Sequence, residues 1–181
     1  MRNPASLPLD LQRDDTRTTL ALSEFGRELH AGLSRRAKSI SPKFFYDVEG
    51  SALFDRICDL PEYYPTRTEL RILTERAGEI AAQIGPNAEL IEFGAGSLTK
   101  VRLLLDALET PRRYVPIDIS GEHLSAAAER LRADYPQLTV QPVAADYTMP
   151  LVLPAPGEGA GRRVGFFPGS TLGNFTPDEA L

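Results

Sequence analysis

Hydrophobic residues in the first half of the chain recur at intervals of three and four positions, the spacing typical of amphipathic helices. Three helices are expected there, over about residues 18–38, 51–59 and 66–84. The third would begin at a capping box, because Glu69 follows Thr66 by three residues, and would end before Gly85. Residues 19–85 are thus predicted to form a helical segment, and the polar residues 1–18 a flexible arm.

After residue 85 the pattern changes to short apolar runs that alternate with helical periodicity. Four strands are expected over residues 89–93, 114–118, 138–144 and 163–167, with helices over about 98–108 and 121–134. Strands that are separated by helices pair in parallel through right-handed crossovers. The sequence therefore predicts an α/β fold with a doubly wound parallel sheet in residues 86–181.

The composition is that of an ordinary globular protein, with 42% hydrophobic and 25% charged residues among 181. A net charge of −5 and a pI near 5.1 argue against a nucleic-acid binder, which needs a basic face. No apolar run approaches the ~20 residues that span a bilayer, and the N-terminus lacks the apolar stretch of a secretory signal. With Cys58 as its single cysteine, the protein is expected to be cytoplasmic, without a nucleic-acid or membrane partner.

A glycine turn stands where the first predicted strand meets its helix. Gly94 and Gly96 let backbone N–H groups approach a ligand, but the dinucleotide fingerprint would need a third glycine where Thr99 stands. The spacing alone is equally consistent with a plain tight turn. The acids at the ends of the next two strands, Asp118 and Asp146, favour a binding site, because the carboxyl ends of parallel strands meet at one edge of a sheet.

This pattern fits S-adenosylmethionine better than a dinucleotide, because there is no pyrophosphate for a third glycine to cradle. Asp118 would accept the ribose hydroxyls, and Asp146 with Tyr147 would pair with the adenine amino group and cover its ring. Lys100 opposes the dipole of the helix that follows the turn, and a ligand carboxylate such as that of the methionine moiety would explain it. From spacing alone, a solvated lysine explains Lys100 equally well.

Five longer segments make a more specific pattern. They are FFYDVEGSALFD (44–55), LPEYYPTRTE (60–69), IEFGAGSLTK (91–100), YVPIDIS (114–120) and FFPGSTLGNF (166–175). In order and spacing they resemble the histidine-specific, S-adenosylmethionine-dependent methyltransferases, the family of the L-histidine Nα-methyltransferase of ergothioneine biosynthesis. The resemblance covers about residues 40–181 and implies a Rossmann-like class I methyltransferase fold with S-adenosyl-L-methionine as cofactor.

The resemblance also implies roles for particular residues. The expected cofactor contacts are Tyr46, Gly94, Gly96, Lys100, Asp118, Asp146 and Tyr147, and the expected contacts of the substrate's carboxylate and α-amine are Tyr63, Gly169 and Asn174. Tyr46 is in addition the candidate catalytic residue. The implied reaction adds three methyl groups to the α-amine of L-histidine and gives trimethylhistidine (hercynine). Aromatic faces suit an amine that becomes cationic, although packing beside Pro65 is the simpler explanation of Tyr63 without the resemblance.

Part of the family's fold is expected to lie outside this chain. The resemblance implies a sheet ordered roughly 3-2-1-4, with strand 163–167 at an exposed edge that is open to self-association. Thr176, Pro177 and Glu179 have the pattern of a helix start two residues before Leu181. We therefore expect a sheet truncated after its fourth strand, and a chain that alone binds the cofactor weakly and methylates histidine poorly or not at all.

Two alternatives stay open. One is a non-catalytic fragment that binds S-adenosylmethionine and needs a partner chain, and the other is a methyltransferase for a different amino acid or amine. No residue here matches those that recognise the imidazole ring in the family. Thr99 disfavours an NAD-dependent dehydrogenase. His30 and His123 lie on separate predicted helices, which disfavours a zinc site, and Cys58 is expected to be a small buried hydrophobic residue.

Overall fold

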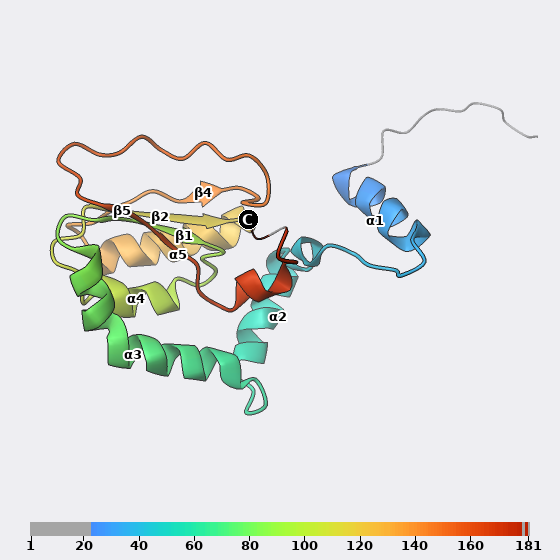
Figure 1. Ribbon diagram of the computed structural model, residues 1–181, viewed down its shortest axis with the longest axis horizontal. Coiled ribbons are helices and arrows are strands. Elements are labelled where there is room, and N and C mark those ends of the chain that lie inside the picture. Colours follow the sequence, from blue (N-terminus) through green and yellow to red (C-terminus); the bar gives the residue numbers. More distant parts are fainter. Residues whose placement is uncertain (1–22, 179, 181) are drawn as a thin grey trace, which may run out of the picture. The chain divides into compact units, whose positions relative to one another are not determined.

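The computed structural model describes residues 23–178 and 180 (Figure 1). The chain divides into two compact units, one up to Ser41 and one from Pro42 onward. The predicted flexible arm, residues 1–18, lies outside the described residues, and the predicted division of the chain near residue 85 stays a prediction. Among the described residues, no helix is both long and apolar enough to cross a membrane.

The first unit contains one described helix, α1 (Glu24–Ser34). It begins where the Ser23 hydroxyl oxygen accepts the Gly26 N–H at 3.1 Å. It ends four residues earlier than predicted, because the chain turns back and the Ser39 N–H donates to the Gly32 carbonyl at 3.4 Å. A Cβ at Gly32 would lie 1.9 Å from the Ser39 carbonyl oxygen, so the turn depends on glycine at this position.

The second unit opens with a helical part. It contains a 3-10 turn, η1 (Pro42–Phe45), and the helices α2 (Val48–Cys58) and α3 (Tyr64–Ile84). α2 begins three residues before its predicted start, because the Asp47 carboxylate accepts the Gly50 N–H at 2.7 Å and caps the helix. The cap and the 3-10 turn together fix the backbone of Tyr46, which lies between them.

The start of α3 differs from the prediction. The helix begins at Tyr64 with Pro65 in its first turn, a position where the missing N–H of proline costs nothing. The predicted capping box of Thr66 and Glu69 is therefore wrong, because both residues lie inside the helix. The Glu69 carboxylate instead bonds groups on other elements, which are described below.

A side chain at Gly50 is expected to destabilise the second unit. A Cβ there would lie 1.8 Å from the Phe45 carbonyl oxygen, whereas a Cβ at Gly78 in α3 would have no heavy atom within 4 Å. Gly50→Ala should lower the free energy of unfolding by about 1–3 kcal/mol, since the backbone must shift. The matched change Gly78→Ala should raise it by about 0.5–1 kcal/mol, since it replaces a glycine inside a helix. Urea denaturation measures both, and equal effects would contradict the contact.

The sheet is parallel and has the predicted order. In space its strands are β3 (Thr139–Val140), β2 (Arg113–Asp118), β1 (Glu89–Phe93) and β5 (Arg163–Phe166), with β4 (Val143–Ala144) also paired with β2. The predicted strand 138–144 is thus two short strands, because Pro142 has no N–H for the ladder. Among the described strands, β5 pairs on one side only, as the order 3-2-1-4 predicts.

The helices between the strands follow the prediction closely. α5 (Gly121–Asp134) has its predicted bounds, and α4 (Thr99–Leu105) is three residues shorter than predicted at its C-terminal end. After β5 comes a second 3-10 turn, η2 (Thr171–Asn174). At the predicted last helix, the Ala180 N–H donates to the Thr176 carbonyl at 3.0 Å, and Glu179 of its predicted capping box lies outside the described residues.

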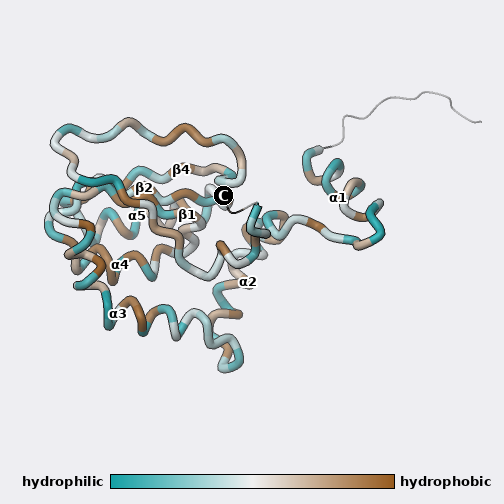
Figure 2. Tube along the Cα trace, in the orientation of Figure 1, coloured by the Kyte–Doolittle hydropathy of each residue, from teal (hydrophilic) through white to brown (hydrophobic). Residues whose placement is uncertain are grey.

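Two apolar layers enclose the sheet (Figure 1). On one face α3, α4 and α5 pack on β1 and β2 around a core that includes the fully buried Leu90 and Tyr114. On the other face the loop 147–161, drawn in orange, covers the buried Ile91 and Val115 of the strands. Figure 2 shows the hydrophobic residues gathered along the strands and α4. These layers hold the carboxyl ends of β1, β2 and β4 at one common edge.

An ion cluster closes the opposite, amino-terminal edge of the sheet. Glu89 of β1 is fully buried and lies in register between Arg113 of β2 and Arg163 of β5. The guanidinium Nε atoms lie 3.5 and 3.1 Å from its two carboxylate oxygens, and the Gly157 N–H donates to Oε1 at 2.6 Å. The cluster therefore joins the strands β2, β1 and β5 to one another and to the loop that contains Gly157.

Candidate active site

The glycine turn between β1 and α4 is held against β2. Gly94 and Gly96 have φ values of +69° and +54°, in the left-handed region that glycine adopts without strain. The N–H groups of Gly94 and Ala95 both donate to the Ile117 carbonyl, at 2.9 and 3.1 Å. The ring of Tyr147 lies 3.7 Å from where a Cβ of Gly94 would stand. The turn is thus a half-buried stretch of backbone with an aromatic ring beside it.

Asp118 lies at the end of β2, next to this turn. Its Oδ2 accepts the Gly96 N–H at 3.0 Å, and its Oδ1 accepts the Ser120 N–H at 2.9 Å. Both bonds come from backbone groups, so they orient the carboxylate without neutralising it. Each oxygen keeps a lone pair for a further donor, which is what two adjacent ribose hydroxyls require.

Asp146 follows β4 and carries two unpredicted partners. Lys43 Nζ lies 2.9 Å from Oδ2, and Thr148 donates to Oδ1 from both its N–H and its hydroxyl. Partial burial opposes ionisation of Asp146, but the hydrogen bonds from Thr148 and Lys43 outweigh it and lower the pKa. Asp146 is therefore an anion that joins the 3-10 turn η1 to the segment that follows β4.

Aromatic rings line the site on two sides. Tyr147 contacts Phe93 and Phe167 edge to face, with ring centroids 6.2 and 5.5 Å away. Tyr46 and Tyr63 both contact Phe54 of α2, with centroids 5.9 Å apart in each pair. The structure thus brings together tyrosines that follow η1, precede α3 and follow β4.

The three tyrosines of the site stay protonated at neutral pH. Burial, and then the charge of Asp118, raise the pKa of Tyr46 and raise that of Tyr147 to about 12. Burial, and then the neighbouring Cys58, raise the pKa of Tyr63. Tyr46 therefore offers a neutral phenol and an aromatic face to a reacting group, and it is not a proton acceptor at pH 7.

Two serines that the sequence did not single out fix the position of Tyr46. The Ser120 hydroxyl donates to the Tyr46 carbonyl, and Ser51 of α2 lies 2.9 Å from Ser120, oxygen to oxygen. Ser51 is buried, so this pair is shielded from competing water. It joins the backbone of Tyr46 to the segment that carries Asp118.

Lys100 is not a solvated lysine. Its ammonium pairs with the Glu69 carboxylate of α3, and the other oxygen of Glu69 accepts the Gly169 N–H at 2.6 Å. Gly169 has a φ of +86°, and the following 3-10 turn η2 ends at the exposed Asn174. The predicted substrate residues Tyr63 and Gly169 thus adjoin the cofactor residues, while Asn174 makes no side-chain hydrogen bond within the described part of the chain.

Glu92 is a fully buried acid near the carboxyl end of β1. It accepts a hydrogen bond from the Tyr114 hydroxyl. Burial raises the pKa of Glu92 to about 8, although the Tyr114 hydrogen bond and the charge of Lys100 oppose the rise. At pH 7 Glu92 is mostly neutral, so it adds hydrogen bonding to the site and little negative charge.

The raised pKa of Glu92 makes the free energy of unfolding depend on pH. The folded state keeps the Glu92 proton up to about pH 8, whereas the unfolded chain loses it above its ordinary pKa of 4.5. Since the folded state binds more protons in this window, the free energy of unfolding should fall as the pH rises through it. Glu92→Gln, which stays neutral, should flatten that part of the profile, and the exposed Glu129→Gln should not. Denaturation across the window measures the slope, and a wild-type slope in Glu92→Gln would refute the assignment.

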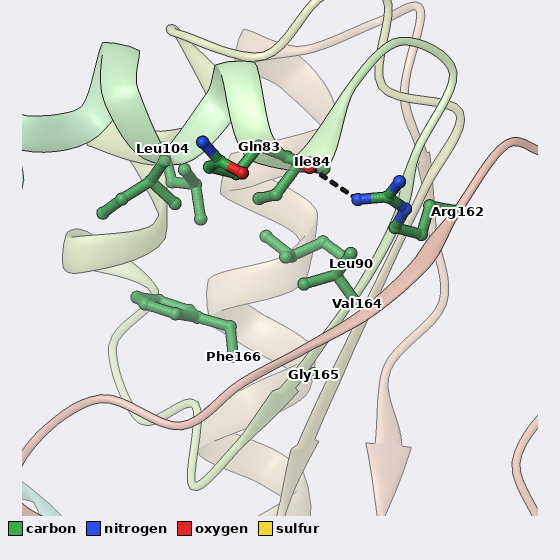
Figure 3. A pocket seen from close by; sticks show the side chains of 9 residues that line it. Gln83, Ile84, Leu90, Leu104, Arg162, Val164, Gly165 and Phe166 are labelled. Atoms are coloured by element: carbon green, nitrogen blue, oxygen red, sulfur yellow. Dashed lines mark hydrogen bonds between the residues drawn. The ribbon is translucent and has the colours of Figure 1, made fainter.

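An apolar hollow of about 380 Å³ lies on the α3 side of β5, away from the acids of the site. Figure 3 shows Ile84, Leu90, Leu104, Val164 and Phe166 around it, with Arg162 bonded to the Gln83 carbonyl at its rim. None of the described residues that line this hollow carries a carboxylate that would bind a ribose or an amine. Within the described residues there is also no group of three or more His, Cys, Asp or Glu that could hold a metal.

The residues of the site fit S-adenosyl-L-methionine. The carboxylates of Asp118 and Asp146, the ring of Tyr147 and the ammonium of Lys100 are of the chemical types that a ribose, an adenine and a ligand carboxylate require. A parallel sheet of this order, with a glycine turn after its first strand and acids after the next two, has the architecture of the Rossmann-like class I S-adenosylmethionine-dependent methyltransferases.

Comparison with known proteins shows to which family of methyltransferases the chain belongs. Residues 25–181 match the model of the family described as histidine-specific methyltransferase, SAM-dependent, and the chain belongs to this family. It is 44% identical over 155 residues to the histidine N-alpha-methyltransferase of Mycolicibacterium smegmatis, and 43% identical over 154 residues to that of Mycobacterium tuberculosis. Each match covers 83% of this chain and 47% of the relative, so the chain spans about half the length of these relatives.

A third relative is named for the pathway that the resemblance implied. The chain is 44% identical over 94 residues to the ergothioneine biosynthesis protein 1 of Neurospora crassa, a match that covers 50% of this chain and 10% of that protein. The cofactor of the family is S-adenosyl-L-methionine. The expected family, fold and cofactor are confirmed, and the role of each site residue stays a prediction.

Proposed function

We propose that this protein is an N-methyltransferase that adds methyl groups to the α-amine of L-histidine and gives trimethylhistidine for ergothioneine biosynthesis. The observation that carries the proposal is the convergence of Asp118, Asp146 and Lys100 around the glycine turn, beside Tyr46 and Tyr63. The names of the relatives in Mycolicibacterium smegmatis and Neurospora crassa support the substrate and the pathway.

The chain's own residues would bind and orient the two reactants. Asp118 accepts the ribose hydroxyls, Asp146 and Tyr147 hold the adenine, and Lys100 binds the methionine carboxylate. When bound, the cofactor would supply a methyl group on a cationic sulfur: the amine lone pair forms the N–C bond in line as the C–S bond breaks, and the sulfur leaves as the neutral thioether S-adenosylhomocysteine. Such a reaction depends chiefly on positioning and on an uncharged amine.

The tyrosines suit the change that the amine undergoes. Each methylation removes an N–H donor, and the third leaves a permanent cation. The neutral rings of Tyr46 and Tyr63 offer faces that attract a quaternary ammonium. Tyr63, Gly169 and Asn174 are proposed to hold the carboxylate and the α-amine of the amino acid.

Mass spectrometry of reaction products tests the proposal. L-histidine is incubated with S-adenosylmethionine and either this chain or a form extended to the length of its relatives. We expect mono-, di- and trimethylated histidine with the extended form and little product with the chain alone. Methylation of another amino acid in place of histidine would refute the substrate, and cofactor binding without any methylation would favour the non-catalytic alternative.

Two further expectations stay proposals. We place the protein in the cytoplasm, and we propose that copies of this chain associate through the free side of β5. The second follows from the unpaired N–H and C=O groups of an edge strand. Sedimentation of the chain over a range of concentrations measures association, and a monomer throughout would refute it.

A further inference from the structure

The ion pair of Glu69 and Lys100 lies where the two halves of the site meet. Glu69 comes from α3, Lys100 from α4, and their side chains are 25% and 23% exposed. The Gly169 N–H donates to the second oxygen of Glu69 at 2.6 Å. The pair is therefore oriented by a backbone group and remains accessible to a ligand.

The pair has the chemistry that complements an α-amino acid. A zwitterionic amino acid carries a carboxylate and an ammonium on the same carbon, and a carboxylate beside an ammonium can bind both by exchanging partners. Each new bond is charge-assisted, so little is lost when the internal pair opens. A lone lysine would bind only the carboxylate and would leave the ligand's ammonium without an anion.

The other acids near the glycine turn are already engaged. Asp118 accepts two backbone N–H groups and faces the ribose position, and Asp146 pairs with Lys43 and Thr148. Glu92 is fully buried and bonded by Tyr114. Among the described residues around the turn, Glu69 is also engaged, but its charged partner is Lys100, which a ligand's carboxylate can take over so that Glu69 is left for the ligand's ammonium.

We propose that the Glu69–Lys100 pair receives the zwitterionic amino-acid end of the cofactor, with Lys100 binding the carboxylate and Glu69 binding the α-ammonium. This inference rests on the proposed function for the identity of the ligand. The free amino acid carries the same zwitterion, but its amine must be uncharged to react. A carboxylate beside that amine would favour its charged form, so Glu69 suits the amine that does not react.

The hydrogen bond from Gly169 also joins Glu69 to the segment before η2.

Calorimetry with three related ligands tests the proposal. S-adenosylhomocysteine carries the full zwitterion, its decarboxylated form carries the amine alone, and 5′-methylthioadenosine carries neither. Glu69→Gln should weaken the decarboxylated ligand and S-adenosylhomocysteine by about tenfold or more, the value of a charge-assisted hydrogen bond. Lys100→Met should weaken S-adenosylhomocysteine alone. Binding of 5′-methylthioadenosine should stay unchanged in both, which also shows that the variants are folded.

A matched control is available on the same helix. Glu79 also pairs with a cation, at 2.6 Å from Arg76, but on the exposed surface. Glu79→Gln should leave the binding of all three ligands unchanged. A loss there equal to that of Glu69→Gln would mean that the charge of α3, and no specific contact, sets the affinity, and would overturn the proposal.

The remaining outcomes are also decisive. Tighter binding of S-adenosylhomocysteine to Glu69→Gln would mean that Glu69 only competes for Lys100, and would overturn the proposal. Loss of L-histidine binding with unchanged S-adenosylhomocysteine binding would assign the pair to the substrate instead. If Asp118→Ala weakens all three ligands and Glu69→Gln weakens none, the cofactor site stands and this inference alone fails. If wild-type protein binds none of the three, both fail.

Discussion

Asp118→Ala should weaken binding of S-adenosylhomocysteine by about 100-fold, because two charge-assisted hydrogen bonds to ribose hydroxyls are lost. The change also removes the acceptor of the Gly96 N–H at 3.0 Å, so the glycine turn loses its connection to the end of β2. Both effects act on the cofactor half of the site. Isothermal titration calorimetry of wild type and variant measures the loss.

Two further variants separate charge from position. Asp118→Asn keeps one acceptor oxygen and should lose about tenfold, since one charge-assisted bond is replaced by a weaker neutral one. Asp134→Ala removes an exposed carboxylate that pairs with Arg102 at 2.7 Å, and should leave affinity unchanged. A folded Asp118→Ala protein that binds S-adenosylhomocysteine as tightly as wild type would rule out the assigned ribose site.

Local sequence patterns predicted the sheet well, because its strands are short apolar runs and the helices between them show the helical spacing of apolar residues. β1 and α5 have their predicted bounds, and the order of the strands is the one that the family resemblance implied. The third strand was predicted as one piece, since its alternation is continuous, but the missing N–H of Pro142 breaks the ladder.

Side-chain partners far apart in sequence could not be predicted from these patterns. Lys43 and Asp146 are 103 residues apart, and no local spacing relates them. Glu69 gave a false signal, because its spacing from Thr66 is that of a capping box while its carboxylate bonds Lys100 and Gly169. The longer motifs held a usable signal, since Glu69 and Lys100 each end one of the segments that carry the resemblance.

The acids of the candidate site show that the position of an acid in a strand does not reveal its charge in the fold. The acids Asp118 and Asp146 were found from their positions at strand ends, whereas Glu92, which lies near the end of β1, is buried and mostly neutral at pH 7. Burial depends on how α3 and α4 pack on the sheet, which the position of an acid in a strand does not reveal. The sequence therefore gives the type of each residue in the site, whereas the protonation state of an acid such as Glu92 depends on how the folded chain buries it.

Glu89→Ala should lower the free energy of unfolding by about 3–5 kcal/mol, because it leaves two arginines facing each other without their shared carboxylate. Glu89 is fully buried, while the Arg113 and Arg163 side chains are 18% and 28% exposed. The cluster joins β2, β1 and β5, so its loss acts on the strands that carry the glycine turn and Asp118. Urea denaturation of wild type and variant measures the effect.

A double variant tests the electrostatic cause. In Arg163→Met with Glu89→Leu the buried anion and one of its cations are both replaced by apolar groups, so the loss should be smaller than in Glu89→Ala alone. Glu79→Ala, which breaks the exposed pair with Arg76, should cost less than about 1 kcal/mol. If Glu89→Ala, the double variant and Glu79→Ala all lose the same free energy of unfolding, the cluster contributes no more to stability than an exposed ion pair. Because the cluster lies at the edge opposite the site, a destabilised but folded Glu89→Ala protein should still bind S-adenosylhomocysteine, which separates stability from cofactor recognition.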